Sequence, residues 1–462
     1  MDRFSFPQSL AYVESLIPKA GTPLVQNLRL ERIQALLARI GNPERSFKSV
    51  HVGGTSGKGS TCYLISSILT AAGYKTGLHV SPHLEYIGER IQINGVAITQ
   101  EDFAVLVSWI RPFVEEVEKT GSFGTPTYFE VLVSLAFEHF RRSGVEIAVV
   151  EVGLGGERDA TNVLAPPVAV LTNVDLDHTE ILGNTVEEIA RDKAGIIKQG
   201  MQVISAAKQP SVREIIENRC REKNALLMLI GRDVTYSITA SNSNGSRFSI
   251  TTSKKNYTDL TISLLGRHQI ENAACAVAAV EALEETRVAI APVAFRQGLA
   301  ACRVPGRMEI ISRSPLIVLD GAHNPAKMRA LVDAIREIFP DKKISCVFGA
   351  KTGKDVASML DILAPLIVDF RFTQSSAVTD TGKSTGMDPA ALAELLYAKG
   401  ITAPIACTAS PHEALKKARA TLADDGLVLI TGSLYVVGEV RTLLRQEKQI
   451  NTSPTIVYNV LR

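Results

Sequence analysis

The segment that most restricts the fold is a β-type run that passes directly into a glycine-rich loop and then a helix. The run FKSVHV is followed by GGTSGKGST at residues 53–61, with helical sequence from about Lys58. Such an arrangement directs backbone N–H groups and the positive end of the helix at one point, which suits phosphate oxygens. The strict pattern GxxxxGK[ST] fails, because Val52 replaces its first glycine and Gly59 follows the lysine. A phosphate-binding loop is still preferred to a plain glycine turn, because a turn has no need of Lys-Gly-Ser.

The side chains of this loop are also suited to binding a nucleotide and its magnesium ion. Lys58 would neutralise the outer phosphates of a nucleotide, and a hydroxyl from Ser60 or Thr61 could bind magnesium. The predicted nucleotide-binding residues of the loop are Gly54, Thr55, Gly57, Lys58, Gly59, Ser60 and Thr61.

The rest of the chain alternates apolar β-type runs with helical stretches, the rhythm of strand-helix-strand units around a parallel sheet. From about residue 231 to 265, short segments rich in Ser, Thr and Asn predict an antiparallel excursion. Pro305-Gly306 interrupts the pattern before a new strand, PLIVLD. With 462 residues, 45% of them apolar, the chain is long enough for two cores. We predict an α/β protein with a doubly wound, mostly parallel domain at residues 1–304 and a smaller Rossmann-like domain at 308–462.

The charge balance and the cysteine content restrict the kinds of molecule that this protein can bind and the compartment in which it works. Lys and Arg number 50 against 48 Asp and Glu, so no global field attracts nucleic acid or an anionic membrane. The six cysteines are scattered without a CxxC pair, which is typical of a reducing compartment. We find neither a secretory apolar core at the start nor an uninterrupted apolar run of about 18 residues. These features predict a soluble cytoplasmic protein with small-molecule partners, binding neither nucleic acid nor membrane.

Two strand ends carry candidate metal ligands. Glu151 ends the run EIAVVEV, and His178 follows PVAVLTNV within the segment DLDH. The carboxyl ends of strands form the ligand crevice of an open α/β sheet, so both residues are placed to bind divalent ions near the phosphate loop. The alternatives are a solvent-exposed charge for Glu151 and a hydrogen-bonded loop histidine for His178.

Lys193 lies in the helical stretch EEIARDKAGIIK. A buried lysine with a lowered pKa can react with carbon dioxide to give a carbamate, which is an anionic oxygen ligand. The residues alone favour the alternative, an ordinary helix lysine.

Several separate segments, in this order, resemble the folylpolyglutamate synthase and dihydrofolate synthase branch of the Mur ligase superfamily. Besides the phosphate loop, they are SPHLEYIGERIQING, TYFE, EVGLGGERDATNV, TNVDLDHTEILGNTVEEIARDKAGIIK, GRHQIENAACAVAA, PGRME, LDGAHNP and TGSLYVVGEV. The match that they carry extends over nearly the whole chain. Any one of them could arise by chance, but the ordered set could not.

The resemblance implies an ATP site between two domains, with two magnesium ions. Ser60 and Glu151 would bind the first ion, and His178 with a carbamylated Lys193 the second. Further nucleotide contacts are implied for Asn272, Arg307, Asp320 and His323. Catalytic roles are expected for Lys58, Lys193 and His323.

The resemblance also implies a pterin pocket. Thr127 and Phe129 of TYFE and Asp159 of ERDATN would line it, with Phe129 offering an aromatic face to a flat ring. The segment that borders the pocket contributes Ser81, His83 and Arg90. The family's Gly-Arg-Leu-Asp run is Gly-Glu-Arg-Asp at residues 156–159, which brings an extra charge close to this pocket.

The implied reaction is ATP-dependent addition of L-glutamate to a folate-type carboxylate through an acyl phosphate, by an enzyme that is typically monomeric. The carboxylate substrate would be dihydropteroate, a reduced folate, or both. A cell-wall Mur enzyme or another glutamate-adding ligase is the first alternative, against which TYFE and SPHL argue. A P-loop switch or transport ATPase is a more distant one, and it would hydrolyse nucleotide without a pterin or an amino acid.

Overall fold

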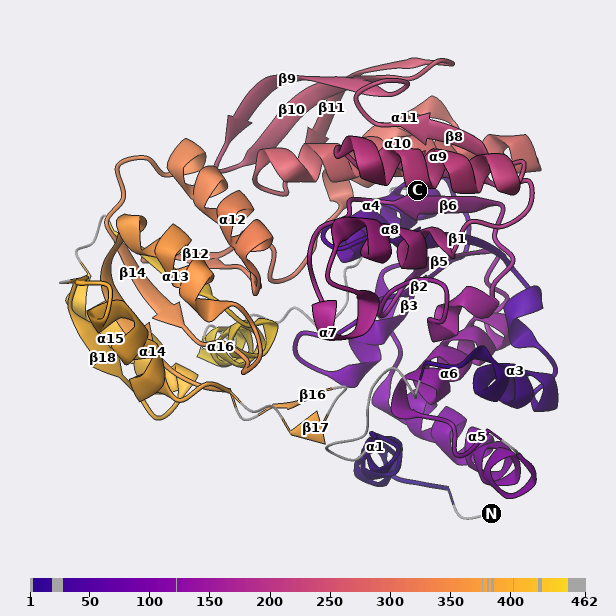
Figure 1. Ribbon diagram of the computed structural model, residues 1–462, viewed down its shortest axis with the longest axis horizontal. Helices are drawn as coiled ribbons and strands as arrows, with labels where there is room; N and C mark the ends of the chain where they lie inside the picture. Colours follow the sequence, from indigo (N-terminus) through magenta and orange to yellow (C-terminus); the bar gives the residue numbers. More distant parts are fainter. Residues whose placement is uncertain are drawn as a thin grey trace.

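The computed structural model describes residues 3–18, 28–121, 123–375, 377–379, 382–383, 386–401, 403–422 and 426–447. Two α/β bodies lie side by side, the larger built from the N-terminal two thirds of the chain (Figure 1). In this described part, none of the helices combines the length and the apolar composition that crossing a membrane requires.

The larger body is built around an eight-stranded sheet in the order β4-β3-β2-β5-β1-β6-β7-β8, as far as the chain is described. Strands β2, β5, β1, β6, β7 and β8 run parallel, while β3 and β4 add an antiparallel edge. The strands are β1 (Lys48–Gly53), β2 (Thr76–His79), β3 (Ile91–Ile93), β4 (Val96–Ala97), β5 (Ile147–Glu151), β6 (Val168–Leu171), β7 (Gln202–Ser205) and β8 (Leu226–Leu229).

Helices cover both faces of this sheet because its strands are apolar on both sides. In β5, Val149 faces a core shared with helices on one side, while Ala148 and Val150 face the core on the other. The first face carries α4 (Lys58–Ala71), α10 (Arg267–Leu283) and α11 (Pro292–Ala301). The second carries α1 (Phe6–Ser15), α3 (Leu30–Arg39), α5 (Gln100–Thr120), α6 (Tyr128–Arg142), α8 (Val186–Ala194) and α9 (Pro210–Glu222), with the short α7 (Thr179–Leu182) at the strand ends. This is the predicted doubly wound arrangement.

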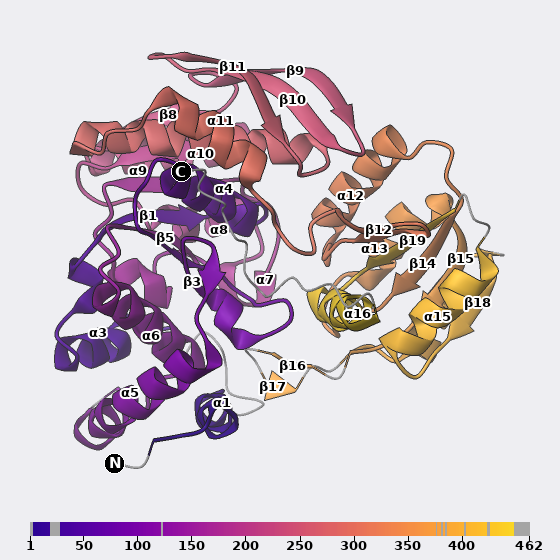
Figure 2. The same cartoon turned by 180° about the vertical axis from the view of Figure 1, so that it is seen from behind.

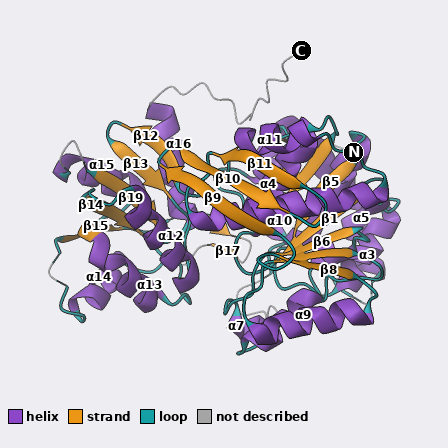
Figure 3. Cartoon of the chain, turned by 90° about the horizontal axis from the view of Figure 1, so that it is seen from above, coloured by secondary structure: helices purple, strands orange, loops and turns teal. Residues whose placement is uncertain are grey.

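The predicted antiparallel excursion is a three-stranded sheet of β9 (Thr235–Asn242), β10 (Gly245–Thr251) and β11 (Asn256–Ile262). The burial along β10 alternates, since Phe248 and Ile250 point into the core shared with α10 while Ser249 between them is less buried. Figure 3 shows this sheet over the α10 face of the larger sheet, with α9 on the opposite face.

The smaller body contains a six-stranded sheet in the order β12-β13-β19-β14-β15-β18, all parallel except the edge strand β12. Its strands are β12 (Glu309–Arg313), β13 (Leu316–Leu319), β14 (Ile344–Phe348), β15 (Ile367–Phe372), β18 (Ile405–Cys407) and β19 (Leu427–Thr431). Its helices are α12 (Pro325–Ile338), α13 (Val356–Leu363), α14 (Pro389–Tyr397), α15 (Pro411–Thr421) and α16 (Leu434–Glu447). A two-stranded ribbon, β16 (Val378–Thr379) and β17 (Gly382–Lys383), lies outside this sheet.

The sequence prediction omitted β12, which precedes the predicted strand PLIVLD and pairs with it antiparallel. Residues 448–462, which the prediction placed in the second domain, lie outside the described residues.

Candidate active site

The site lies where the strand order of the larger sheet reverses. Strand β1 has β5 on one side and β6 on the other, and the chain leaves all three strands at the same edge. Ligands of open α/β sheets bind at such an edge. A cavity of about 470 Å³ opens there, and both bodies contribute to its lining. This volume is typical of a small-molecule site.

The phosphate loop has the backbone shape that only glycine allows easily. Gly54 and Gly57 have φ values of +132° and +84°. A Cβ on Gly54 would come 2.0 Å from Thr172 Oγ1, and one on Gly57 would come 2.4 Å from Asn272 Oδ1. Helix α4 begins at Lys58, so its first N–H groups, which have no acceptor within the helix, face the cavity.

Residues after β6 hold this loop in place. Thr55 N–H donates to Asn173 O at 2.9 Å, and Ser56 N–H donates to Asn173 Oδ1 at 2.8 Å. The Thr172 hydroxyl donates to Ser56 O at 2.7 Å. Sequence reasoning missed Asn173, although its place at the end of a strand beside β1 was a usable signal.

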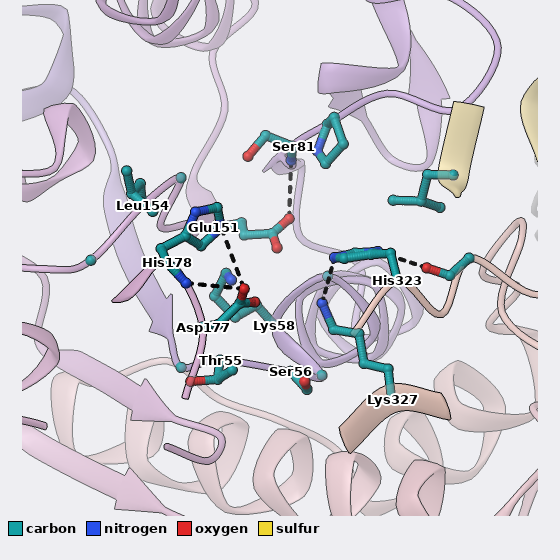
Figure 4. A pocket seen from close by; sticks show the side chains of 18 of the residues that line it. Thr55, Ser56, Lys58, Ser81, Glu151, Leu154, Asp177, His178, His323 and Lys327 are labelled. Atoms are coloured by element: carbon teal, nitrogen blue, oxygen red, sulfur yellow. Dashed lines mark hydrogen bonds and ion pairs between the residues drawn. The ribbon is translucent and has the colours of Figure 1, made fainter. Parts of the chain in front are cut away.

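Glu151, at the end of β5, points into the cavity beside the first turn of α4. Its Oε2 accepts the Ser81 N–H at 3.0 Å and would lie 3.5 Å from a Cβ on Gly59. Burial raises the pKa of Glu151, and Lys58 opposes that shift. The hydrogen bond between Ser81 and Glu151 ties the Ser81 segment to the end of β5 (Figure 4).

Lys193, in the last turn of α8, is buried and donates through Nζ to Gly54 O at 3.1 Å. Burial, with the nearby Lys58, lowers its pKa to about 7. Its close neighbour Gly156 leaves no room for a side chain, because a Cβ there would lie 2.8 Å from Lys193 Cα. Lys193 is therefore a buried lysine whose amine lies within hydrogen-bond distance of the phosphate loop.

His178 lies in a left-handed backbone conformation, with φ of 51°, just before α7. Its ring is 3.9 Å from Asp177 Oδ1 and 3.6 Å from Glu180 Oε1, and burial lowers its pKa. A neutral imidazole at the cavity wall is the protonation state in which histidine binds a metal.

The predicted pterin residues lie at one end of the same cavity. Thr127 caps α6, and the ring of Phe129 in the first turn packs so close to Gly153 that a Cβ there would lie 2.4 Å from Phe129 Cζ. Asp159 is buried and accepts N–H bonds from Leu154 at 2.8 Å and Thr161 at 3.0 Å. Backbone donors therefore fix its carboxylate.

The C-terminal body supplies the opposite wall. Asp320 follows β13, and its two oxygens accept the N–H groups of Met308 at 2.9 Å and Ala322 at 2.8 Å. Arg307 lies against Gly321, where a Cβ would come 2.6 Å from its Nη1. Asp320 therefore fastens the linker that carries Arg307 to the turn that carries His323.

With three exceptions, the site residues predicted from sequence line this cavity. Thr61 is buried in α4, and its Oγ1 has no hydrogen-bond partner among the described residues. Arg90 is buried behind the cavity, donates to His83 Nδ1 at 2.9 Å, and lies over the Tyr128 ring at 5.6 Å. The substrate-binding roles of His83 and Arg90 stay predictions.

The extra charge next to the predicted pterin pocket divides between two residues. Glu157 and Arg158 are both exposed, but of the two only Arg158 is among the residues that line the cavity. The charge that faces this end of the cavity is therefore positive.

Sequence reasoning also missed a cluster contributed by both bodies. Lys354 Nζ donates to Asp177 Oδ1 at 2.9 Å, and Asn324 Nδ2 donates to Asp177 Oδ2 at 3.2 Å. Burial by itself would raise the pKa of Asp177. The nearby positive charges of Lys327 and Lys354 outweigh this effect, so the pKa of Asp177 is lowered. Lys327 and Lys354 follow Asp177 by 150 residues or more, so no local sequence pattern could reveal the cluster.

The donors present suit magnesium that is shared with phosphate. No group of three or more His, Cys, Asp or Glu side chains in the described chain could hold a metal by itself. Magnesium commonly takes only one or two protein ligands and completes its shell with water and substrate phosphates. Glu151 beside the α4 N-terminus and a neutral His178 fit that pattern.

The fold and this site are those of a Mur ligase. The model of the Mur ligase middle domain matches residues 52–280, and that of the Mur ligase glutamate ligase domain matches residues 306–434. The two matches correspond to the two bodies that meet at the cavity.

Comparison with individual relatives shows to which family of Mur ligases the chain belongs. The dihydrofolate synthase/folylpolyglutamate synthase of Bacillus subtilis is 35% identical over 90% of this chain and 95% of its own. The structure of Mycobacterium tuberculosis folylpolyglutamate synthase complexed with ADP is 29% identical and superposes with a TM-score of 0.86, covering 95% of this chain and 98% of that one. Escherichia coli FolC in complex with DHPP and ADP is also 29% identical, with a TM-score of 0.82 over 96% and 99% of the chains. The chain belongs to the folylpolyglutamate synthase/dihydrofolate synthase family of Mur ligases.

Proposed function

We propose that this protein is an ATP-dependent ligase that joins L-glutamate to the carboxylate of a folate-type substrate. The observation that carries this proposal is a single cavity lined by the phosphate loop, the Phe129 end and the 320–323 turn. A triphosphate, a flat ring with its carboxylate, and an amino acid would therefore meet between the two bodies.

The chemistry begins with the substrate carboxylate attacking the γ-phosphate of ATP. An acyl phosphate forms and ADP leaves. Lys58 and the first N–H groups of α4 would bind the phosphates and stabilise the charge that develops on them. The amine of glutamate then attacks the acyl carbon, loses a proton, and displaces inorganic phosphate as the amide forms.

Magnesium, when bound, would supply positive charge that reduces the repulsion between the carboxylate and the triphosphate. We propose Ser60 and Glu151 as ligands of one ion, and His178 with a carbamylated Lys193 as ligands of a second. The burial of Lys193 beside Lys58, which lowers its pKa to about 7, supports a neutral amine able to react with carbon dioxide.

At the other end, Phe129 would stack on the pterin ring, while Thr127 and Asp159 fix the loop and helix around it. We infer that both dihydropteroate and reduced folates are accepted, because TYFE with DATN resembles bacterial enzymes that use both. The remaining contacts proposed for ATP come from Asn272, Arg307, Asp320 and His323, so closure about residues 305–306 would accompany catalysis.

We infer that the enzyme acts as a cytoplasmic monomer on small molecules alone, because one chain supplies both walls of the cavity. The division of the chain into domains 1–304 and 308–462 is part of the same proposal.

The test is phosphate release with ATP and glutamate, plus either dihydropteroate or tetrahydrofolate in parallel. A ligase releases phosphate only when both co-substrates are present, and the glutamylated product appears in equal amount. Release with ATP alone would instead identify a switch or transport ATPase. Release that requires glutamate but neither pterin would point to another Mur-type ligase.

A further inference from the structure

Lys327 brings a lysine to the cavity from the wall opposite the phosphate loop. It lies in the first turn of α12, where its N–H donates to Oδ1 of the N-cap residue Asn324 at 2.9 Å. Its side chain lines the same cavity as Lys58 and Arg307. Figure 4 shows this side chain directed toward His323.

The hydrogen bonds of His323 determine how Lys327 is held. His323 Nδ1 lies 2.8 Å from Gly321 O, and a carbonyl oxygen can only accept, so Nδ1 carries the proton. Burial, with Lys327 and Lys354 nearby, lowers the pKa of His323 well below its usual value, so the ring is neutral. Nε2 is then an acceptor, and it receives a hydrogen bond from Lys327 Nζ at 2.9 Å. In this arrangement His323 presents no donor to a phosphate, whereas Lys327 retains further N–H bonds that can.

The charges nearby leave Lys327 without an ion-pair partner. The carboxylate that acts most strongly on it, that of Asp177, is already engaged by Lys354 at 2.9 Å and by Asn324 at 3.2 Å. In the part of the chain that the structure describes, Lys327 itself forms no ion pair. Burial and the neighbouring cations lower the pKa of Lys327 to about 7, although Asp177 opposes that shift, so an anionic phosphate beside Nζ would favour its charged form.

We propose that Lys327 binds the terminal phosphate of ATP from the C-terminal body, and that His323 is a positioning residue that orients it. Lys58 and the α4 amides bind the phosphates from the other side, so the phosphoryl group that is transferred lies between two lysines. The proposal rests on the proposed function only in taking the nucleotide to be ATP.

The terminal phosphate is favoured over the inner ones by the groups that surround Lys327. Its electrostatic neighbours include Lys58 and Asp177, and it also acts on Glu151, the carboxylate at the start of α4. These groups line the cavity near the first turn of α4, whereas Asn272 packs against the loop at Gly57.

The experiment measures nucleotide binding by calorimetry, with magnesium but without folate or glutamate. The two ligands are ADP and the β,γ-methylene analogue of ATP. For Lys327→Met we expect about tenfold weaker binding of the analogue and less than twofold weaker binding of ADP, the loss of about one charge-assisted hydrogen bond. Lys327→Arg should restore part of the difference. Lys416→Met removes the same charge from an exposed position on α15 and should match the wild type.

Equal losses for both ligands, or an unchanged affinity for the analogue, would overturn the proposal. The positioning role is tested by combining His323→Ala with Lys327→Met. His323→Ala should weaken binding of the analogue in the wild-type protein, but it should add less than a twofold loss when Lys327→Met is already present. If His323→Ala has its full effect in the Lys327→Met protein as well, His323 does not act through Lys327. A protein that shows the selective loss yet glutamylates neither pterin would refute the proposed function while leaving the Lys327 contact established.

Discussion

Burial decides what Lys193 can do chemically. A lysine on the surface is an ammonium ion at neutral pH, but Lys193 is enclosed beside Lys58 and its pKa falls to about 7. The unfolded chain therefore holds a proton between about pH 7 and 10.5 that the folded protein lacks, so this lysine makes folding stability rise with pH across that window. The same shift provides the neutral amine that carbamate formation needs.

Lys193→Ala is expected to lose most turnover, by about 100-fold or more, because a proposed magnesium ligand disappears. In 13C-labelled bicarbonate, the wild type should show a carbamate carbonyl resonance that the variant lacks. That resonance should weaken as the pH falls below about 7, since a protonated amine does not attack carbon dioxide. Near-wild-type ligation by Lys193→Ala would sink the carbamate proposal.

A buried ion pair lies at the Phe129 end of the cavity. Arg32 Nε lies 2.9 Å from Glu130 Oε2, with side-chain exposures of 6% and 4%. Glu130 Oε2 also accepts the Thr127 N–H at 2.7 Å, so the pair fixes the capped start of α6, where Phe129 lies.

Arg32→Met should cost about 3 kcal/mol or more of unfolding free energy, because it leaves a buried carboxylate unpaired. The KM for the pterin substrate should rise as the α6 start loosens. The matched control is Arg3→Met, whose partner Glu101 is 78% exposed, and its cost should stay under about 0.5 kcal/mol. Urea unfolding measures both, and equal costs would contradict the assigned role of the buried pair.

At the scale of elements, α4 connects the phosphate loop to the core. Its N-cap residue is Gly57, at the end that faces the cavity, while Gly73 lies just beyond its C-terminal end. Both glycines have similar backbone angles, with φ of +84° and +90°, but only Gly57 has a neighbour within 4 Å of an added Cβ.

Alanine at either position should therefore cost about 1–2 kcal/mol in backbone strain. Only Gly57→Ala should also weaken ADP binding, because its Cβ would displace Asn272 and shift the loop. Thermal unfolding and calorimetric titration of the two variants separate these effects. Loss of ADP binding in Gly73→Ala as well would show that strain in α4, rather than the loop contact, is responsible.

At the scale of the whole molecule, α16 connects the two bodies (Figure 2). Glu85, in the segment after β2, pairs with Arg441 and Arg445 of α16, the latter at 2.8 Å. Arg441 also reaches Glu309 at 2.9 Å. Gly438 permits this approach, since a Cβ there would lie 2.0 Å from Leu84 O.

Gly438→Ala should separate α16 from the Leu84 segment and so impair closure. Helix propensity alone would favour alanine by about 1 kcal/mol, so the variant should remain folded. We expect at least a tenfold loss of turnover with ADP affinity within about twofold, because the phosphate loop belongs to the other body. Small-angle scattering should show a larger radius of gyration in the presence of substrates. Wild-type turnover would show that this contact is dispensable.

Much of the site followed from local sequence because it lies at strand ends. The loop at residues 53–61, Glu151 and His178 each follow an apolar run, and parallel strands bring their carboxyl ends to one edge. Thr61, His83 and Arg90 lie in the right segments but do not line the cavity, because the side-chain direction within a segment depends on its packing. The edge strand β12 was missed, since an edge strand lacks the continuous apolar character of a buried one.

The sequence by itself determined the doubly wound sheet, the phosphate loop and the family, because these depend on periodicity, turn chemistry and ordered motifs that are local along the chain. Only the tertiary structure decided which groups from the two bodies meet. The Asp177 contacts with Lys354 and Asn324, the docking of α16 at Leu84, and the direction of Lys327 toward His323 all join residues through folding. At the wall formed by the C-terminal body, the hydrogen bonds and the burial of His323, rather than residue type, identify Lys327 as the donor to phosphate.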